Sequence, residues 1–274
     1  MTYRQICLRL SEAGIDSAEW DAELLLEHFC KADRSFILQA PDTDYPSAAL
    51  AEAVARRAAR YPLQYLLGEW QFYRQTYEVS PDCLIPRSDT EILVEEAIRL
   101  LPQGAYFADL CTGSGCIAVS ILAERPDTRA LAVEKFPNTL TLATKNAARN
   151  HVSSRFTPLC ADVLEPCFLP AQSKFDAILS NPPYIRSRVL SELEPELSAE
   201  PVAALDGGED GLIFYRRIIA NTAQHLAPGG FFLFEIGFDQ AEALLQIGEA
   251  ANLSGARVLR DYSDNDRAIL FRKA

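Results

Sequence analysis

A glycine-rich turn follows an apolar stretch and precedes a helical pattern in the segment Asp109-Leu110-Cys111-Thr112-Gly113-Ser114-Gly115-Cys116-Ile117-Ala118. The two glycines let the backbone come close to a ligand, and the start of the helix offers unpaired N–H groups to it. About 20 residues further on, Glu134 ends the next apolar stretch, where a carboxylate is suited to bind both hydroxyls of a ribose. The segment therefore predicts a site for an adenosine-containing cofactor.

The same glycine spacing fits two kinds of cofactor. Gly113-x-Gly115-x-x-Ala118 satisfies the G-x-G-x-x-G/A fingerprint of dinucleotide-binding proteins. Asp109 changes the balance, because we expect its carboxylate to face the cofactor, where it would repel a pyrophosphate and attract an ammonium or a sulfonium. The sequence thus favours S-adenosylmethionine over a dinucleotide.

Strand and helix patterns alternate from Tyr106 onward. The expected strands cover residues 106–110, 130–133, 154–160, 175–179, 230–236 and 268–272. A capping box of Ser88 and Glu91 is expected to begin the helix that precedes them. Such alternation is typical of a doubly wound sheet that binds ligands at the carboxyl ends of its strands. We expect an α/β, Rossmann-like domain with a mostly parallel sheet and an antiparallel edge.

The first seventy residues are typical of a small helical bundle. The apolar positions of residues 3–10 follow helical spacing, and the alanine-rich run of residues 47–60 has high helix propensity. Mixed aromatic, β-branched and polar residues at 72–79 predict a hairpin or an extended connector. We therefore expect a helical domain at residues 1–70, a hairpin linker at 71–85 and a catalytic domain at 86–274.

Charge and composition limit the function. The chain has 274 residues with 26 Lys and Arg against 38 Asp and Glu, a formal net charge of −12 and a sequence pI of about 4.8. This balance argues against a protein that binds phosphate backbones, because non-specific nucleic-acid affinity comes from Lys and Arg. Seven scattered cysteines and three histidines, without a Cys-x-x-Cys pair, indicate neither a disulfide framework nor a metal site.

The N-terminal residues alternate charged and apolar side chains, so we find no signal-peptide pattern there. No apolar run approaches the ~20 residues that a membrane-spanning helix needs. We expect a cytoplasmic, monomeric protein that does not contact a membrane.

A second informative segment is Phe175-Asp176-Ala177-Ile178-Leu179-Ser180-Asn181-Pro182-Pro183-Tyr184, an apolar strand that ends in two prolines. Prolines lack a backbone donor and fix φ at about −65°, so the loop is stiff and its carbonyls need donors from outside. The side-chain oxygen of Asn181 and the carbonyl of Pro182 can form a pair of acceptors, which the two donors of an NH₂ group would match. We expect Tyr184 to form a flat wall against the substrate.

The nitrogen of an amide or aryl amine is a poor nucleophile, because its lone pair is delocalised into the neighbouring carbonyl or ring. Two acceptors that hold the hydrogens out of plane favour the localised, pyramidal form, so they act mainly in the transition state. Alignment with a sulfonium methyl group adds the gain from proximity, which reaches ~7–11 kcal/mol in good cases. These residue types predict methyl transfer to an NH₂ group without a strong base.

The sequence resembles the release-factor glutamine methyltransferases, also called HemK or PrmC, along nearly its whole length. Apart from the two segments already described, the resemblance rests on residues 86–91 and 205–211, which are specific to this family. Further matching segments are residues 62–72, Glu200-Pro201 and Arg260-Asp261-Tyr262-x-Asp264-Asn265-x-Arg267. The sequence departs from the family pattern at Cys111, Ser88 and Glu134, where a glycine, a proline and an aspartate are usual.

The resemblance implies a methyltransferase domain that uses S-adenosylmethionine, yields S-adenosylhomocysteine and methylates N5 of the glutamine in the Gly-Gly-Gln loop of peptide chain release factors. It also implies that the N-terminal helical domain recognises this protein substrate. The predicted cofactor-binding residues are Asp109, Cys111, Thr112, Gly113, Ser114, Gly115, Glu134, Asp162, Val163 and Asn181. The glutamine amide is expected to bind to Asn181, Pro182, Pro183 and Tyr184, with Asn181, Pro182 and Tyr184 as the catalytic residues.

Three other functions stay open on the residues alone. The nearest is transfer to the amino group of adenine or cytosine in nucleic acid, because the same acceptor pair fits a flipped base. A nicotinamide-dependent oxidoreductase would leave residues 181–184 without a role. A scaffold that binds S-adenosylmethionine would keep the cofactor site but transfer no methyl group.

Overall fold

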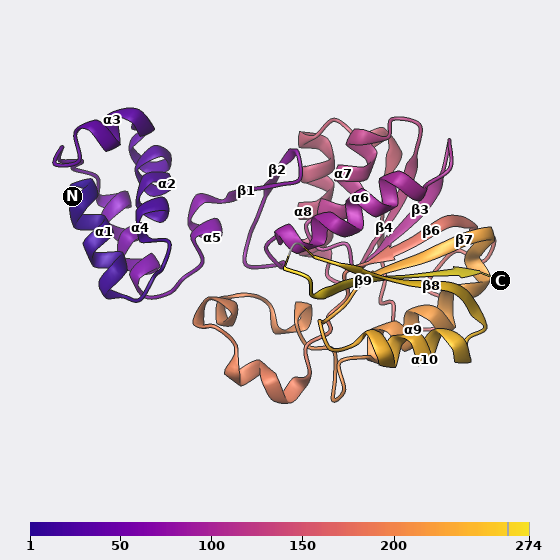
Figure 1. The fold of residues 1–274 in the computed structure, drawn as a ribbon. Helices are drawn as coiled ribbons and strands as arrows, with labels where there is room; N and C mark the ends of the chain where they lie inside the picture. Colours follow the sequence, from indigo (N-terminus) through magenta and orange to yellow (C-terminus); the bar gives the residue numbers. More distant parts are fainter. Residues whose placement is uncertain (262, 274) are drawn as a thin grey trace. The chain divides into compact units, whose positions relative to one another are not determined.

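The computed structural model describes residues 1–261 and 263–273, which form two compact units (Figure 1). The first unit contains Met1–Glu69 and the short segment Leu193–Ala199, and the second contains Trp70–Glu192 and the chain from Glu200 onward. Tyr262, part of one resembling segment, and Ala274, the last residue of the expected catalytic domain, lie outside the described residues.

The first unit is a bundle of short helices around an apolar core. Its helices are α1 (Tyr3–Glu12), α2 (Ala18–Cys30), α3 (Arg34–Gln39), α4 (Ala48–Ala58) and α5 (Leu63–Leu67). Thr2 and Gln5 form a capping box at the start of α1, and the side chains of Asp33 and Ser47 cap α3 and α4. Fully buried side chains such as Ile6, Leu25 and Val54 meet at the centre of the unit.

A buried arginine explains why Leu193–Ala199 belongs to the first unit. Arg57 Nε donates to Asp21 Oδ2 at 2.6 Å, and Arg57 Nη1 donates to Glu196 Oε1 at 3.0 Å. Arg60 Nη2 donates to Glu196 Oε2 at 2.9 Å. Arg57 and Asp21 are both buried, so their charges need this pairing.

A two-stranded hairpin of β1 (Glu69–Phe72) and β2 (Gln75–Glu78) stands at the start of the second unit, and only Glu69 of it belongs to the first. Tyr73, in the turn between them, donates its N–H to Glu91 Oε1 at 2.9 Å. The predicted capping box of Ser88 and Glu91 is therefore wrong. Ser88–Thr90 form a 3₁₀ turn, and α6 (Glu91–Leu100) begins without a side-chain cap because Glu91 is engaged by the hairpin.

The central sheet of the second unit has the strand order β5-β4-β3-β6-β7-β9-β8. The strands are β3 (Tyr106–Leu110), β4 (Arg129–Glu134), β5 (Phe156–Cys160), β6 (Phe175–Ser180), β7 (Leu226–Glu235), β8 (Leu253–Arg260) and β9 (Asp266–Lys273). Neighbours from β5 to β7 pair in parallel, while β9 pairs antiparallel with both β7 and β8. The predicted Rossmann-like sheet with an antiparallel edge is confirmed. The sequence analysis missed β8, because this edge strand is largely exposed and contains a glycine.

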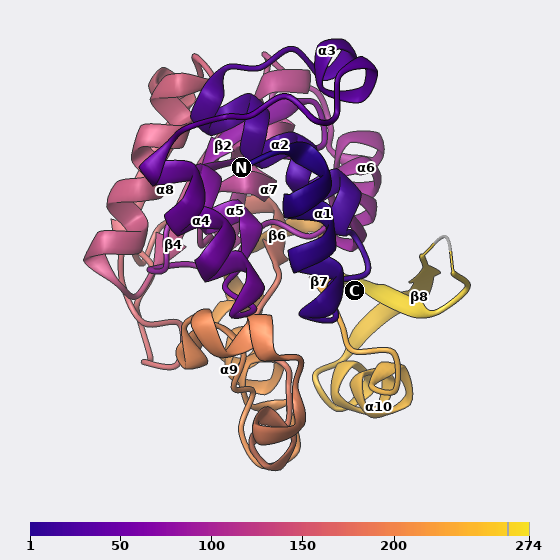
Figure 2. The ribbon, with the colours of Figure 1, turned by 90° about the vertical axis from the view of Figure 1, so that its left-hand side faces the viewer.

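Helices cover both faces of this sheet (Figure 1). One face packs against α6, α7 (Cys116–Glu124) and α8 (Pro137–Arg149), and the other against α9 (Ile213–Thr222) and α10 (Ala241–Ala250). Figure 2 shows α10 next to the edge strand β8. Among the described residues, no helix is long and apolar enough to cross a membrane.

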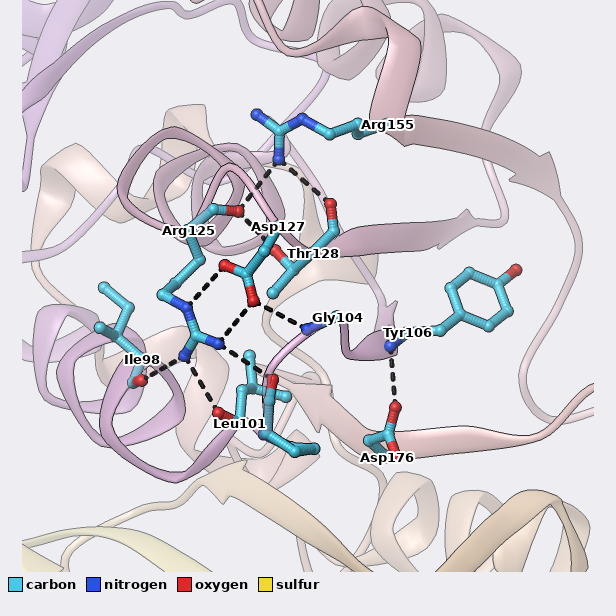
Figure 3. A network of polar contacts seen from close by, with 10 residues as sticks. Ile98, Leu101, Gly104, Tyr106, Arg125, Asp127, Thr128, Arg155 and Asp176 are labelled. Carbon is cyan, nitrogen blue, oxygen red and sulfur yellow. Dashed lines mark hydrogen bonds and ion pairs between the residues drawn. The ribbon is translucent and has the colours of Figure 1, made fainter.

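Two arginines tie together the amino ends of the strands (Figure 3). Arg125 donates to the carbonyls of Ile98 and Leu101 at the end of α6, each at 3.0 Å, and pairs with Asp127. Arg155 donates to the carbonyls of Arg125 and Thr128 at 3.1 Å and to that of Leu122 at 2.7 Å. These side chains donate to carbonyls at helix ends and in loops, where the backbone supplies few donors.

We expect Arg155→Ala to lower the free energy of unfolding by about 1–3 kcal/mol, because the partly buried carbonyls of Leu122, Arg125 and Thr128 each lose one donor. Urea denaturation measures this loss. Arg74→Ala is the matched control, since Arg74 forms an exposed ion pair with Glu124 whose loss should cost about 0–1 kcal/mol. Equal losses in the two variants would contradict the role given to Arg155.

Candidate active site

The predicted site segments lie together at the carboxyl ends of the parallel strands. The glycine-rich turn follows β3, Glu134 ends β4, and Asn181 follows β6, and these three strands are parallel neighbours. A cavity of about 620 Å³ lies at their carboxyl ends. Its lining includes nine of the predicted site residues, namely Cys111, Thr112, Gly113, Ser114, Glu134, Asp162, Val163, Asn181 and Pro183.

Asp109 does not line the cavity, so the expectation that its carboxylate faces the cofactor is corrected. The side chain is completely buried, and Oδ2 accepts hydrogen bonds from Thr112 Oγ1 at 2.6 Å and from the N–H of Ala118 at 3.2 Å. Burial raises the pKa of Asp109 to about 7. This carboxylate holds the glycine-rich turn against the start of α7.

The two glycines of the turn differ in their surroundings. Both have positive φ, which favours glycine, but a Cβ on Gly113 would meet no atom within 4 Å. A Cβ on Gly115 would lie 3.2 Å from the Cβ of Ala143 in α8, and Gly115 is not among the residues that line the cavity. Gly113 thus borders open space, while Gly115 allows helix packing.

Cys111 adopts the left-handed conformation that the usual glycine would adopt more easily. Its φ is +57°, which costs a residue with a Cβ about 1–2 kcal/mol. The turn nevertheless keeps its shape, because Thr112 donates its N–H to the carbonyl of Val133 at 3.0 Å and Gly115 donates to that of Thr112 at 2.8 Å. Burial raises the pKa of the Cys111 thiol, so the thiol stays protonated at neutral pH.

Glu134 presents a carboxylate to the cavity that still has room for donors. Its Oε2 accepts the N–H of Gly113 and its Oε1 that of Phe136, both at 3.1 Å. A carboxylate offers about four acceptor positions, so about two remain. Burial raises the pKa of Glu134, and these N–H groups oppose the rise.

A charged and an apolar residue adjoin Glu134 along the cavity wall. Asp162 pairs with Lys135 at 2.9 Å and accepts the N–H of Leu164 at 2.9 Å. Burial alone would raise the pKa of Asp162, yet these two donors lower it below the usual value. Val163 is buried and contributes an apolar surface to the cavity.

Asn181 lines the cavity and carries a side-chain acceptor without a partner among the described residues. Its Nδ2 donates to Thr90 Oγ1 at 3.3 Å, and its Oδ1 accepts no hydrogen bond from the described residues. The carbonyl of Pro182 likewise accepts none from them, but Pro182 is buried and is not among the residues that line the cavity. Of the expected acceptor pair, the Asn181 oxygen is thus the one whose residue borders the cavity.

Tyr184 lies elsewhere than predicted. It is not among the cavity-lining residues, and its hydroxyl donates to Glu235 Oε1 at 3.3 Å. The expected flat wall against the substrate is therefore not observed. Glu235, at the end of β7, is buried and also accepts the hydroxyl of Thr90 at 2.5 Å. Its pKa is raised to about 7, mainly by burial.

Sequence analysis missed Thr90 and Glu235. A signal was present for Glu235, because an acidic residue follows an apolar run at the carboxyl end of a strand that neighbours β6. Thr90 carried no such signal, since its polar side chain is common in helix starts.

The loop of residues 205–211 packs on the backbone of the Pro-Pro turn. Ile185 donates its N–H to the carbonyl of Leu205 at 2.9 Å, and Gly207 donates to that of Ile185 at 2.8 Å. A Cβ on Gly207 would lie 2.7 Å from the Cα of Tyr184. A Cβ on Gly211 would lie 2.4 Å from the carbonyl oxygen of Tyr184, so both close approaches require glycine.

Arg87 forms an ion pair and also lines the cavity. It pairs with the buried carboxylate of Glu200, whose Oε2 also accepts the N–H of Ile85 at 3.0 Å. Arg87 and Ile85 line the cavity. Glu200 thus fastens the segment before α6 as one wall of the cavity.

The chain matches two family models. Residues 2–68 match the PrmC N-terminal domain, and residues 88–208 match the methyltransferase small domain. The release factor glutamine methyltransferase of Geobacter sulfurreducens is 39% identical over 264 residues, which cover 95% of this chain and 91% of that protein. The release factor glutamine methyltransferase of Cereibacter sphaeroides is 41% identical over 268 residues, which cover 96% and 94%.

A solved structure has a similar fold over much of the chain. The crystal structure of a methyltransferase from Pyrococcus furiosus aligns with a TM-score of 0.55 at 16% identity, covering 72% of this chain and 88% of that chain. At this identity the likeness shows the fold alone. The matches to the family models and to these relatives confirm the family resemblance that the sequence motifs indicate.

Gly211→Ala should destabilise the protein more than Gly104→Ala. Both glycines have nearly the same positive φ, +76° and +73°, so alanine costs each about 1–2 kcal/mol of backbone strain. Only at Gly211 would the new Cβ clash with the Tyr184 carbonyl, which should cost about 1–3 kcal/mol more. Urea denaturation of both variants measures the difference, and equal losses would contradict close packing of the loop on Tyr184.

Proposed function

Because the chain belongs to the family of release factor glutamine methyltransferases, we propose that it methylates N5 of the glutamine in the Gly-Gly-Gln loop of peptide chain release factors, with S-adenosylmethionine as the donor. The observation that carries this proposal is that Asn181, whose Oδ1 accepts no hydrogen bond from the described residues, lines the same cavity as Gly113 and Glu134. An acceptor for an NH₂ group and residues suited to an adenosyl group thus share one cavity.

The chemistry of the cavity lining supports S-adenosylmethionine. Glu134 keeps acceptor positions for the two ribose hydroxyls, and the open space beside Gly113 lets a ligand approach the backbone. Val163 and Phe136 offer apolar surface to a flat base. When bound, S-adenosylmethionine supplies a methyl group that its sulfonium makes electrophilic. We assign cofactor contacts to the eight lining residues that were predicted for the cofactor, and a supporting role to Asp109 and Gly115.

Asn181 is the residue that acts on the substrate amide. Its Oδ1 accepts one hydrogen of the glutamine NH₂ group and draws it out of the amide plane, which localises the nitrogen lone pair. This interaction strengthens as the nitrogen becomes pyramidal, so it lowers the barrier more than it strengthens binding. Pro182 and Pro183 keep the loop stiff, so that Asn181 is preorganised. Transfer of the methyl group would break its bond to the sulfonium sulfur, leave S-adenosylhomocysteine as a neutral thioether, and release one proton from the nitrogen to solvent.

We further propose a separate role for each of three segments of the chain. The helical residues 1–70 recognise the release factor, residues 71–85 connect, and residues 86–274 catalyse the transfer. The enzyme acts as a cytoplasmic monomer on a protein and not on nucleic acid. Its net charge of −12 supports this choice, because phosphate backbones would be repelled.

The proposed function is tested by labelled methyl transfer to a purified release factor and to its variant with Ala in place of the loop glutamine. We expect label on the first protein and none on the second. Nuclease treatment of the substrate should not change the result. Label that disappears with the nuclease would instead establish transfer to an amino group in nucleic acid.

Asn181→Ala should reduce kcat by roughly 10²–10³, by analogy with the loss of one transition-state hydrogen-bond partner. The affinity for S-adenosylmethionine should stay within about twofold of wild type, because Asn181 mainly binds the amide. Single-turnover methyl transfer and isothermal titration measure the two quantities. An unchanged kcat would refute the role of Asn181.

Glu134→Ala should instead weaken cofactor binding by about 10–100-fold, the effect of losing hydrogen bonds to a charged group. Isothermal titration with S-adenosylmethionine measures it. Asp162→Asn is a useful comparison, because it removes the charge paired with Lys135 while Glu134 is untouched, and should weaken binding less. If Glu134→Ala bound S-adenosylmethionine as tightly as the wild type, Glu134 could not be the residue that binds the ribose hydroxyls.

A further inference from the structure

A chain of hydrogen bonds runs from a buried carboxylate to Asn181. Glu235 Oε2, at the end of β7, accepts the hydroxyl of Thr90 at 2.5 Å, and Thr90 Oγ1 accepts Asn181 Nδ2 at 3.3 Å. Both Thr90 and Glu235 are buried, with exposed fractions of 2% each. The three residues come from β7, the 3₁₀ turn before α6 and the loop after β6.

When Glu235 is ionised, the chemistry of these groups determines which one donates in each hydrogen bond. An ionised carboxylate only accepts, so the hydroxyl of Thr90 must donate its one proton to Glu235. The lone pairs that remain on the Thr90 oxygen can only accept. The amide of Asn181 therefore turns its Nδ2 toward Thr90, and its Oδ1 is left for the cavity.

We propose that Thr90 and Glu235 are positioning residues that set which end of the Asn181 amide faces the substrate. The proposal rests on the proposed function, since it assumes that Asn181 accepts from an NH₂ group. In the opposite rotamer the Asn181 NH₂ would face the NH₂ of the glutamine, donor against donor. The two ends of an amide have nearly the same shape, so packing does not discriminate between them and hydrogen-bond partners must.

The carboxylate has further neighbours that bear on its charge. Tyr184 donates its hydroxyl to Glu235 Oε1 at 3.3 Å. Burial raises the pKa of Glu235 to about 7, and Asp89 adds to the rise, while Thr90, Arg267 and Tyr184 oppose it. Tyr215 and Cys116 also interact electrostatically with Glu235, and burial keeps both of them neutral.

Protonation of Glu235 would reverse the chain. A neutral carboxylic acid can donate to Thr90, whose own proton is then free to donate to Asn181 Oδ1. The amide would turn, and its oxygen would leave the cavity. The pKa of Glu235 is raised, so the productive arrangement is present above a pH of about 7 and is lost as the pH falls through that value.

The first test compares Thr90→Val, which keeps the shape but removes the hydroxyl, with Thr90→Ser, which keeps the hydroxyl. We expect Thr90→Val to lower kcat by about 10–100-fold, with the KM for the release factor and the affinity for S-adenosylmethionine within about twofold of wild type. Thr90→Ser should restore most of the kcat. Thr144→Val, on the exposed face of α8, is the matched control and should leave kcat unchanged.

The second test is the pH dependence of kcat under single-turnover conditions. Wild type should lose activity as the pH falls from 8 to 6, and Glu235→Gln, whose side chain does not titrate, should show a lower but flat profile over this range. Asp109, whose pKa is also raised to about 7, stays in both proteins, so a change in profile belongs to Glu235.

These outcomes separate the two proposals. Wild-type protein that transfers no label to a release factor would overturn the proposed function. Wild-type protein that transfers label while Thr90→Val keeps the full kcat would overturn the positioning role alone. So would a kcat loss in Thr90→Ser as large as that in Thr90→Val, or an acid limb that persists in Glu235→Gln. Urea denaturation of each variant shows that the comparison is made between folded proteins.

Discussion

Parallel pairing of three strands determines where the site forms. In the register of the sheet, Leu110 lies opposite both Val133 and Ser180, and the hydroxyl of Ser180 donates to the carbonyl of Leu110 at 2.6 Å. The next residues along these strands are Cys111, Glu134 and Asn181. Segments far apart in the sequence therefore meet at the carboxyl ends of the strands. A shift of register in β3 would move the glycine-rich turn away from Glu134 and Asn181.

Local signals made part of this arrangement predictable. The bounds expected for residues 106–110 match β3, because a short apolar run between turns has few alternative structures. The Pro-Pro turn was equally predictable, since proline restricts its own backbone. The predicted orientation of the Asp109 carboxylate was wrong, because side chains alternate between the two faces of a strand. This carboxylate points toward α7 and not past the end of the strand.

Contacts between distant residues were not predictable in this way. Thr90 and Glu235 are 145 positions apart, and nothing in either segment indicates the other. Tyr184 follows two prolines, but the direction of its ring depends on Glu235 and on the loop that holds its backbone. The apolar pattern that identifies strands also failed for the exposed strand β8.

Three buried acidic residues have the same structural role in the second unit. Asp109, Glu134 and Glu235 each accept donors from a loop or turn at the carboxyl edge of the sheet, and burial raises the pKa of each. The positions of these loops thus depend on hydrogen bonds to desolvated carboxylates rather than on surface ion pairs. Such bonds are little affected by dissolved salt.

The placement of Leu193–Ala199 in the first unit matters for anyone who wishes to study the units separately. The polypeptide passes between the units three times, after Glu69, after Glu192 and after Ala199. A fragment that stops at Glu69 would lack Glu196 and leave the guanidinium groups of Arg57 and Arg60 without one of their carboxylates. Truncation at a single point therefore yields two incomplete pieces, and a fragment of the helical unit needs a graft of the 193–199 segment to be whole.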